Sequence, residues 1–353
     1  VLGFVIRFKK FIGDNMNYKK VFGLLLIGLV VLAAMIIFIG PGEIISALKQ
    51  ANMNYVLLAI ILQVITMILW NLRWSVILGG LNIAHKKITL FAMLLVGLAV
   101  NNLTPSGRGG GEPVRAYLLS KNTNSSFKTT FATVMGDKLF DIFPFTILAI
   151  IAMIYLIFTI HLSIVMLATL IFAIILFVAL LIFIVYICIN ETFGVRVIRW
   201  VFRQLNKVIK RNIEPYEIKI LNSLKGFQTS LLYLLKNKQI FVSAIFISFI
   251  AWFLEIMRMY LVFMAFGVQV SIGMVAAVFL LSTLVGMIPT LPGGLGAIDG
   301  VMILVYSLSG IPPFISTAVT LVERLISFWM VSVLGLLTLP YFGTGVLDEV
   351  DIN

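Results

Sequence analysis

The sequence predicts an all-α polytopic membrane protein whose two halves form an inverted-topology repeat. The first observation is composition: 61% of the residues are hydrophobic, 11% are charged, and the mean hydropathy is +1.13. The second is that several apolar stretches are long enough to span a bilayer. The third is a Pro-x-Gly-x-Gly-x-x-acid pattern at 105–112 that recurs at 292–299, each time inside an apolar region. No soluble domain of this length has such a composition.

Six stretches are predicted to be full transmembrane helices, because about 19 residues at 1.5 Å each cover the hydrocarbon core. They are 21–39, 55–78, 139–159, 162–189, 239–266 and 315–339. Ahead of them, residues 1–20 mix basic and apolar side chains and are expected to form an interfacial segment.

Two further apolar regions, 88–120 and 272–308, are each interrupted by one copy of the repeated pattern. Proline cannot continue the hydrogen-bond ladder of a helix, and glycine permits positive φ. Each region is therefore expected to be a re-entrant hairpin, or a pair of broken spans that raises the count of membrane elements to eight. In both cases the chain returns to the side from which it entered.

The basic residues set the predicted orientation. The net charge is +12, and segment 190–238 holds ten Lys and Arg residues against three acids. The positive-inside rule places this segment in the cytoplasm, and counting crossings from it places both termini there. We expect a multi-pass protein of the cell membrane that attracts anionic lipids. No basic-aromatic motif for nucleic acid is visible.

The expected organisation is a first membrane repeat over 21–159, a second over 162–339 and a cytoplasmic tail over 340–353. The second repeat is interrupted by 191–236, where apolar residues recur at helical spacing among the basic ones. Glu214 and Pro215 mark a break between two amphipathic helices. These helices are predicted to lie on the inner leaflet; the alternative is a docking site for a lipid-modifying partner.

Three markers recur in the same order in both halves. Arg73 lies 32 residues before the first copy of the pattern, and Arg258 lies 34 before the second. An acid–base–Leu triplet starts 25 residues after Glu112, at Asp137, and again 24 residues after Asp299, at Glu323. The two halves have opposite predicted orientations. Broken segments at corresponding positions of such halves point to a substrate site near the mid-plane.

Phosphate is the ligand chemistry that the two patterns favour. A glycine-rich turn before a helix presents free N–H donors and a positive dipole end, and arginine can bind two phosphate oxygens. The candidate residues for a lipid head group are Arg73, Thr104, Pro105, Ser106, Gly107, Arg108, Gly110, Glu112, Arg115, Arg258, Pro292, Gly293, Gly294, Gly296 and Asp299. Alternatively, Glu112 and Asp299 cap the helices that they begin.

Local interactions compete with ligand binding at the arginines. Arg258 is spaced to pair with Glu255 in its own helix, Arg73 is placed to snorkel to the cytoplasmic face, and Arg108 and Arg115 flank Glu112. Asp137, Asp141 and Glu323 are candidates for ion or proton coupling. The competing interpretation is that Asp137, Lys138, Glu323 and Arg324 are structural counter-charges.

No cofactor and no metal site are expected. His85 and His161 stand alone without ligand spacing, and Cys188, the single cysteine, lies in an apolar run. No ATP-binding motif is visible, so transport would be driven by lipid gradients or by ion coupling. An enzymatic role is therefore the less favoured class.

Residues 102–107 (Asn-Leu-Thr-Pro-Ser-Gly) with 110–119 (Gly-Gly-Glu-Pro-Val-Arg-Ala-Tyr-Leu-Leu) resemble the signature of the lysylphosphatidylglycerol synthase transmembrane-region family, also called the flippase-like domain family. Residues 288–296 are similar to its second signature. The resemblance covers about 20–340 and carries over Pro105, Gly107, Gly110, Glu112, Arg115 and Pro292 through Gly296. Arg108 and Gly109 lengthen the glycine-rich run by one residue relative to the family form.

The resemblance implies movement of a phosphate-containing lipid between leaflets, either an aminoacylated phospholipid or a polyprenyl-phosphate-linked lipid. In the multiple peptide resistance factors this membrane domain precedes a soluble aminoacyl-transferase domain. No such domain is expected within the 353 residues, so synthesis of lysyl-lipid is not carried over. Some archaeal relatives act in dolichol-linked glycosylation. The alternatives are therefore an enzyme or enzyme subunit acting on polyprenyl phosphate, and a scaffold for a lipid-modifying partner at 191–236.

Overall fold

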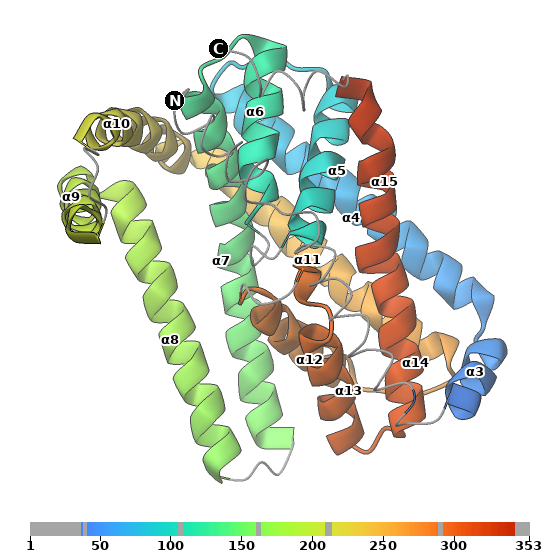
Figure 1. The fold of residues 1–353 in the computed structure, drawn as a ribbon. Coiled ribbons are helices and arrows are strands. Elements are labelled where there is room, and N and C mark those ends of the chain that lie inside the picture. The colour runs from blue at the N-terminus through green and yellow to red at the C-terminus, as the bar shows by residue number, and fades with distance from the viewer. Residues whose placement is uncertain are drawn as a thin grey trace.

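The computed structural model describes residues 37, 41–104, 109–159, 164–208, 214–288 and 292–342. Every regular element in these ranges is a helix (Figure 1), which confirms the predicted all-α class. In chain order the helices are α3 (Pro41–Gln50), α4 (Met53–Gly80), α5 (Lys87–Leu103), α6 (Gly111–Thr123), α7 (Phe127–Thr159), α8 (Ile164–Ile189), α9 (Glu191–Val208), α10 (Glu214–Lys236), α11 (Lys238–Ala265), α12 (Ile272–Gly286), η2 (Pro292–Gly294), α13 (Ala297–Leu308), α14 (Pro313–Arg324), η3 (Leu325–Met330), α15 (Val331–Thr338) and η4 (Leu339–Phe342).

Four helices within the described ranges are long and apolar enough to cross a membrane: α4, α7, α11 and the run Pro313–Phe342. A pair bent by 109°, Leu181–Ile189 with Glu191–Gln204, raises the count to five if it is one span. The prediction of six full spans is therefore not confirmed. Apart from residue 37, the stretch 21–39 lies outside the described residues. The stretch 162–189 contributes α8 (Ile164–Ile189), of which only the end enters the bent pair.

One succession of four elements occurs twice among the described helices. A 28-residue helix (α4, then α11) is followed by two short helices and one long helix. Both 28-residue helices begin at an asparagine cap, with Asn52 accepting from the N–H of Asn54 at 3.0 Å and Asn237 accepting from that of Ile240 at 3.2 Å. The two halves therefore share an element order as well as the three sequence markers.

The predicted breaks at the repeated pattern are present. Helix α5 ends at Leu103 and α6 begins at Gly111, while α12 ends at Gly286 and α13 begins at Ala297. None of these four helices exceeds 17 residues, fewer than a membrane span needs. In Figure 1 the α5–α6 pair lies in the upper half of the molecule and the α12–α13 pair in the lower half. The two breaks meet between them, where η2 packs against α5.

Helices α4 and α11 make the most extensive helix–helix contact of the described residues, packed antiparallel along much of their length. The N–H of Asn52, at the start of α4, donates to the carbonyl oxygen of Ala265, at the end of α11, at 2.7 Å. Helix α7 packs against both and contains Pro144, which has no N–H to donate to the preceding turn. The indole N–H of Trp252 donates to the carbonyl of Asp141 in that turn at 3.2 Å.

The amphipathic helices predicted within 191–236 are α9 and α10, and α10 begins at Glu214 as expected. Helix α10 packs closely on the bundle: Leu231 and Leu234 are fully buried, and Leu234 contacts α7 at Gly136. Trp200 and Ile218 are more than half exposed. The α9–α10 pair therefore has one face that is part of the core and another that is open.

Candidate functional site

Three charged residues of the first half meet in one buried group. The carboxylate of Asp137, on α7, lies between two arginines from different helices. Its Oδ1 is 2.7 Å from Nε of Arg73 on α4, and its Oδ2 is 2.9 Å from Nη2 of Arg115 on α6. All three residues are at most 7% exposed. Two charge-assisted bonds on one buried carboxylate give the group a fixed geometry.

Arg73 has two further partners. Its Nη1 is 2.5 Å from Oδ1 of Asp141, one turn along α7, and donates to the hydroxyl of Ser248 on α11 at 2.8 Å. It is therefore held inside the bundle by side chains of two other helices, α7 and α11, and the interpretation that Arg73 snorkels to the surface is wrong. Arg115 lies over the ring of Trp74 at 4.0 Å and pairs with Asp137 in place of Glu112, the neighbour that its sequence position favours.

Glu112, in the first turn of α6, forms an ion pair with a lysine of α7. Its Oε1 is 2.6 Å from Nζ of Lys138, the residue after Asp137 on α7. The amide of Asn101 on α5 donates to the same oxygen at 3.4 Å and accepts the N–H of Gly111 at 2.6 Å. Asn101 thus satisfies the start of α6, which leaves the carboxylate of Glu112 available for Lys138. We call Arg73, Glu112, Arg115, Asp137, Lys138 and Asp141 the first cluster.

The second half repeats two of these pairs at corresponding positions. Nη1 of Arg258, on α11, is 3.1 Å from Oε1 of Glu323, as Arg73 pairs with Asp137. Nε of Arg324 is 3.0 Å from Oδ1 of Asp299, as Lys138 pairs with Glu112. The predicted pair of Arg258 with Glu255 is also present, at 2.7 Å. We call Glu255, Arg258, Asp299, Glu323 and Arg324 the second cluster.

Asp299 also caps its helix, as the alternative interpretation predicted. Oδ2 of Asp299 accepts a hydrogen bond from the N–H of Gly296 at 2.7 Å, and Asp299 is fully buried. Arg324 donates to the carbonyl of Gly293 at 2.7 Å. The second glycine-rich turn is therefore tied to α14 through both its backbone and its acid. Glu112 and Asp299 correspond in position but differ in their contacts.

The two breaks touch each other. The amide of Asn102, at the end of α5, donates to the hydroxyl of Ser332 at 3.0 Å and to the carbonyl of Phe328 at 3.3 Å. Gly293 has φ +56°, and a Cβ there would lie 2.0 Å from the ring of Phe328 and 3.0 Å from the carbonyl of Asn102. Only glycine fits that turn at this approach. Phe328 lies in a π-helical turn that directly follows Arg324.

Two members of the first cluster are partly open. The side chain of Lys138 is 30% exposed and that of Asp141 is 25% exposed, whereas the paired side chains of the second cluster are at most 10% exposed. Lys138 and Asp141 are three residues apart on α7 and share a helix face. The first cluster is thus accessible from one side, through one cation and one anion.

Most of the predicted head-group residues fall at these clusters and breaks. Thr104 follows α5, Gly110 precedes α6, and Pro292, Gly293, Gly294 and Gly296 form the buried turn before α13. Pro105, Ser106, Gly107 and Arg108 lie outside the described residues. The sequence prediction missed Asn101, Asn102 and Ser248. The two asparagines lie three and four residues before Pro105, the start of the first pattern, and this position was the signal for them.

The ion pairs Glu112–Lys138 and Asp299–Arg324 occupy corresponding positions but differ in burial. Double-mutant cycles on the two pairs should therefore give different coupling energies. We expect Glu112→Gln with Lys138→Gln to give a coupling energy of about 1 kcal/mol, and Asp299→Asn with Arg324→Gln to give about 3 kcal/mol, because the second pair is almost solvent-free. Thermal unfolding in detergent measures both. Equal coupling energies for the two pairs would contradict the prediction that burial strengthens the second pair.

The chain is similar to known membrane proteins over most of its length. The model of the family described as lysylphosphatidylglycerol synthase TM region matches residues 25–335. A UPF0104 membrane protein of Methanothermobacter thermautotrophicus is 46% identical over 326 residues, covering 92% of this chain and 96% of the relative. UPF0104 membrane proteins of Methanocaldococcus jannaschii (33%; 88% of this chain and 92% of the relative) and Pyrococcus horikoshii (30%; 90% and 95%) are also similar. A glycosyltransferase of Haloferax volcanii, AglD, matches 118 residues at 29% identity, covering 33% of this chain and 19% of that protein.

Proposed function

Since the chain belongs to the lysylphosphatidylglycerol synthase transmembrane-region family, we propose that it is a lipid translocase. It would move a phosphate-containing lipid between leaflets, with the head group passing the first cluster. The observation that carries this proposal is a partly open group of buried charges where two broken membrane elements meet. Charged side chains inside a membrane normally face a substrate path or a partner.

The repeated pairs support an inverted repeat of membrane elements. Helices α4 and α11 are antiparallel, and the broken pairs α5–α6 and α12–α13 lie in opposite halves of the molecule (Figure 1). We propose that 88–120 enters the membrane from the cytoplasm and 272–308 from outside. Such halves can rock against each other around a site at the mid-plane and expose it to each side in turn.

The open face of the first cluster suits a zwitterionic or phosphate head group. Lys138 would take a phosphate oxygen, and Asp141 would take an amine or hydroxyl. Arg73 and Arg115 lie deeper in the cluster and would add positive potential at the head group. Asp137 already holds both side chains in place, so binding would cost no further side-chain entropy. Glu112 would exchange its ion pair with Lys138 for one with the lipid. This proposal adds Lys138 to the sequence-predicted residues as a direct contact.

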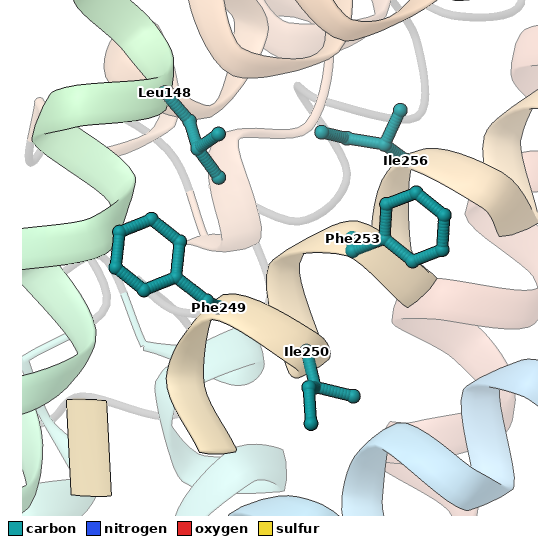
Figure 2. A pocket seen from close by; sticks show the side chains of 5 residues that line it. All are labelled: Leu148, Phe249, Ile250, Phe253 and Ile256. Carbon is teal, nitrogen blue, oxygen red and sulfur yellow. The ribbon is translucent and has the colours of Figure 1, made fainter. Parts of the chain in front are cut away.

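An apolar pocket beside the first cluster would take an acyl chain. It has a volume of about 330 Å³ and lies between α7 and α11, lined by Leu148, Phe249, Ile250, Phe253 and Ile256 (Figure 2). Phe249 directly follows Ser248, which accepts from Arg73. Leu148 is seven residues after Asp141, roughly 10 Å along α7. The head group and one chain of a lipid could thus be held together.

Translocation by reconstituted protein tests the proposal. In proteoliposomes containing fluorescent phosphatidylglycerol, we expect inner-leaflet label to become accessible to an external reductant faster than in protein-free liposomes. Glu112→Gln and Lys138→Gln should each slow this about tenfold, equivalent to about 1.4 kcal/mol. Lys86→Gln, an exposed charge outside the clusters, is the control. A wild-type rate equal to that of protein-free liposomes rejects the proposal; unchanged rates in both cluster variants remove the first cluster from it.

A second candidate is glycosyl transfer to a polyprenyl phosphate, which the short match to a protein named glycosyltransferase favours. The same first cluster could hold the phosphate of the lipid acceptor. Purified protein given a sugar nucleotide and a polyprenyl phosphate would then form glycosylated lipid. The absence of product, with lipid movement present in the proteoliposomes, would decide for translocation.

A further inference from the structure

Helix α9 lies across the end of an apolar helix. Helix α8 has no charged residue in its sequence and runs beside α7, a candidate span (Figure 1). The last part of α8, from Leu181, meets α9 at an angle of 109°. The side chain of Asn190 accepts a hydrogen bond from the N–H of Phe193 at 2.9 Å and so caps the start of α9. Since α8 runs beside a candidate span, a helix bent this far from it lies close to the membrane plane.

One face of α9 turns toward exposed aromatic side chains of α8. The ring centroid of Phe193 lies 4.8 Å from that of Tyr186 and 5.9 Å from that of Phe183, and both α8 residues are about half exposed. Trp200 follows Phe193 by seven residues, two helical turns, and shares its face. Trp200 is 58% exposed. An exposed indole at the end of an apolar helix is typical of the membrane–water interface, where its apolar ring and polar N–H are both satisfied.

Three exposed arginines form a stripe beside this face. Arg196, Arg199 and Arg203 follow one another at intervals of three and four residues, which places them along one side of α9. Glu191 is the only acid in the sequence of this helix and lies in its first turn. Arginine binds two phosphate oxygens through its planar fork. The stripe is therefore suited to several phosphates at the level where Trp200 meets the interface.

A buried glutamine of α10 ties this turn to the next helix. The side-chain amide of Gln228 donates to the carbonyl oxygen of Ile187 at 2.9 Å and to that of Asn190 at 3.4 Å. Gln228 is 1% exposed. A Cβ at Gly194, on α9, would lie 2.7 Å from Nε2 of Gln228, so glycine permits the close approach of α9 to α10. The turn between α8 and α9 therefore cannot shift without disturbing α10.

The other end of α10 reaches the helices of the first cluster. Leu234 is fully buried in one apolar group with Ile77 and Phe140. Ile77 lies one turn after Arg73 on α4, and Phe140 lies three residues after Asp137 on α7. Helix α10 therefore packs on both helices that bring Arg73 and Asp137 together, at the level of that ion pair. Close-packed side chains transmit a shift of one element to its neighbours.

An anionic membrane leaflet fits this surface better than a soluble partner does. The ten Lys and Arg residues of 190–238, against three acids, give the charge that such a leaflet attracts. An acidic protein would match the arginines as well. It would not explain why Trp200 is exposed on the face that α9 turns toward the aromatic end of α8, or why α9 lies across α8. Both features are expected of an amphipathic helix in the interface.

We propose that α9 binds anionic lipids of the inner leaflet, with Trp200 at the boundary of the acyl chains and the arginine stripe on the lipid phosphates. These lipids are held at the surface, separate from a head group that passes the first cluster. Through α10, their binding holds the first cluster in the arrangement that moves lipid. This regulatory part rests on the proposed function, whereas the binding part does not.

Tryptophan quenching tests the binding part without any assay of lipid movement. The full chain is placed in phosphatidylcholine vesicles that contain a fixed share of phosphatidylcholine brominated near the head group, and increasing fractions of phosphatidylglycerol. The quenching lost in Trp200→Phe is the Trp200 signal. We expect this signal to rise with the fraction of phosphatidylglycerol. Salt at 1 M should suppress the rise, because it shortens the Debye length to about 3 Å.

Arg196→Gln and Arg203→Gln should each raise the fraction of phosphatidylglycerol that gives half of the rise about fivefold, the contribution of one basic residue near an anionic surface. The matched control is Lys86→Gln with Lys87→Gln, which removes two exposed cations away from α9 and should leave the curve unchanged. A Trp200 signal that does not depend on phosphatidylglycerol overturns the arginine site. Absence of the signal at every composition overturns the leaflet as the occupant and leaves the surface to a protein partner.

The regulatory part is tested in proteoliposomes with a constant trace of fluorescent phosphatidylglycerol. Its rate of movement should rise about fivefold with the fraction of unlabelled phosphatidylglycerol, at the lower end of coupling between sites. Competition for the transport path would lower the rate instead. Arg196→Gln with Arg203→Gln should abolish the rise. Gln228→Met, which keeps the side-chain volume but cannot donate, should keep the Trp200 signal and lose the rise.

The outcomes separate this inference from the proposed function. Absence of lipid movement rejects the translocase and the regulatory part, while the Trp200 signal still decides the binding part. Lipid movement that is independent of phosphatidylglycerol, in vesicles where the Trp200 signal responds, rejects the regulation and leaves the translocase standing. A full rise in Gln228→Met overturns α10 as the connection.

Discussion

Replacement of Asp137 by asparagine is expected to cost roughly 3–5 kcal/mol, because it leaves two buried arginines without their shared carboxylate. Asp137 is 2% exposed, and each of its oxygens binds a different arginine. The measurement is the free energy of unfolding in detergent, or the thermal midpoint where unfolding is irreversible. Asp141→Asn is the matched control: it removes a carboxylate from the same helix and the same arginine, but one that is 25% exposed, and should cost far less.

The second half suggests a rescue of this variant. Its position equivalent to Arg115 is Met302, so Arg115→Met combined with Asp137→Asn should recover part of the lost stability by removing one unpaired charge. If the double variant is no more stable than Asp137→Asn alone, the loss comes from packing and not from charge. The unfolding of both variants should be measured at the same salt concentration.

Gly111→Ala is expected to separate α5 from α6 and to cost about 3 kcal/mol, the upper end for overpacking. A Cβ at Gly111 would lie 1.9 Å from the backbone carbonyl oxygen of Gly97, and a backbone atom cannot rotate away as a side chain can. The variant should therefore disturb Asn101, which accepts the N–H of Gly111, and through it Glu112.

Gly79→Ala is the control for this prediction, because no atom lies within 4 Å of a Cβ there. It lies in α4, where alanine is favoured over glycine by up to about 1 kcal/mol. The thermal midpoint should fall for Gly111→Ala and hold or rise for Gly79→Ala. Equal midpoints for the two variants would show that α5 and α6 do not depend on close backbone contact.

Much of the fold could be predicted from local sequence. Proline and glycine decide where a helix ends through their own backbone chemistry, so the breaks after α5 and α12 were predicted at the right places. The spans 55–78, 139–159, 239–266 and 315–339 are contained in helices α4, α7, α11 and Pro313–Phe342 but for one end residue. The boundaries of α7 were less accurate, since its first turns, from Phe127, are polar and are held by packing on α6 and α10.

The candidate site was predicted as a set of residues and not as a set of pairs. Arg73, Arg115 and Asp137 were named, but the shared carboxylate was not, because the three lie on different helices far apart in the chain. Only the Arg258–Glu255 pair followed from spacing, since both residues lie on one helix face. Asparagine and serine are common residue types, so residue type alone does not distinguish Asn101 and Ser248. Their roles depend on the partners that helix packing brings to them, the N–H of Gly111 and the side chain of Arg73.

The all-helical membrane class, the two broken elements and the matching order of charged markers in the two halves could all be predicted from the order of the amino acids. These follow from hydropathy and backbone chemistry, which act over a few residues. The packing of the helices was needed to learn which charges pair between helices, that Asn101 and not Glu112 satisfies the start of α6, and that Glu255 and Glu323 share one arginine. Ion pairing depends on distances between helices, and those distances are set by how the helices pack.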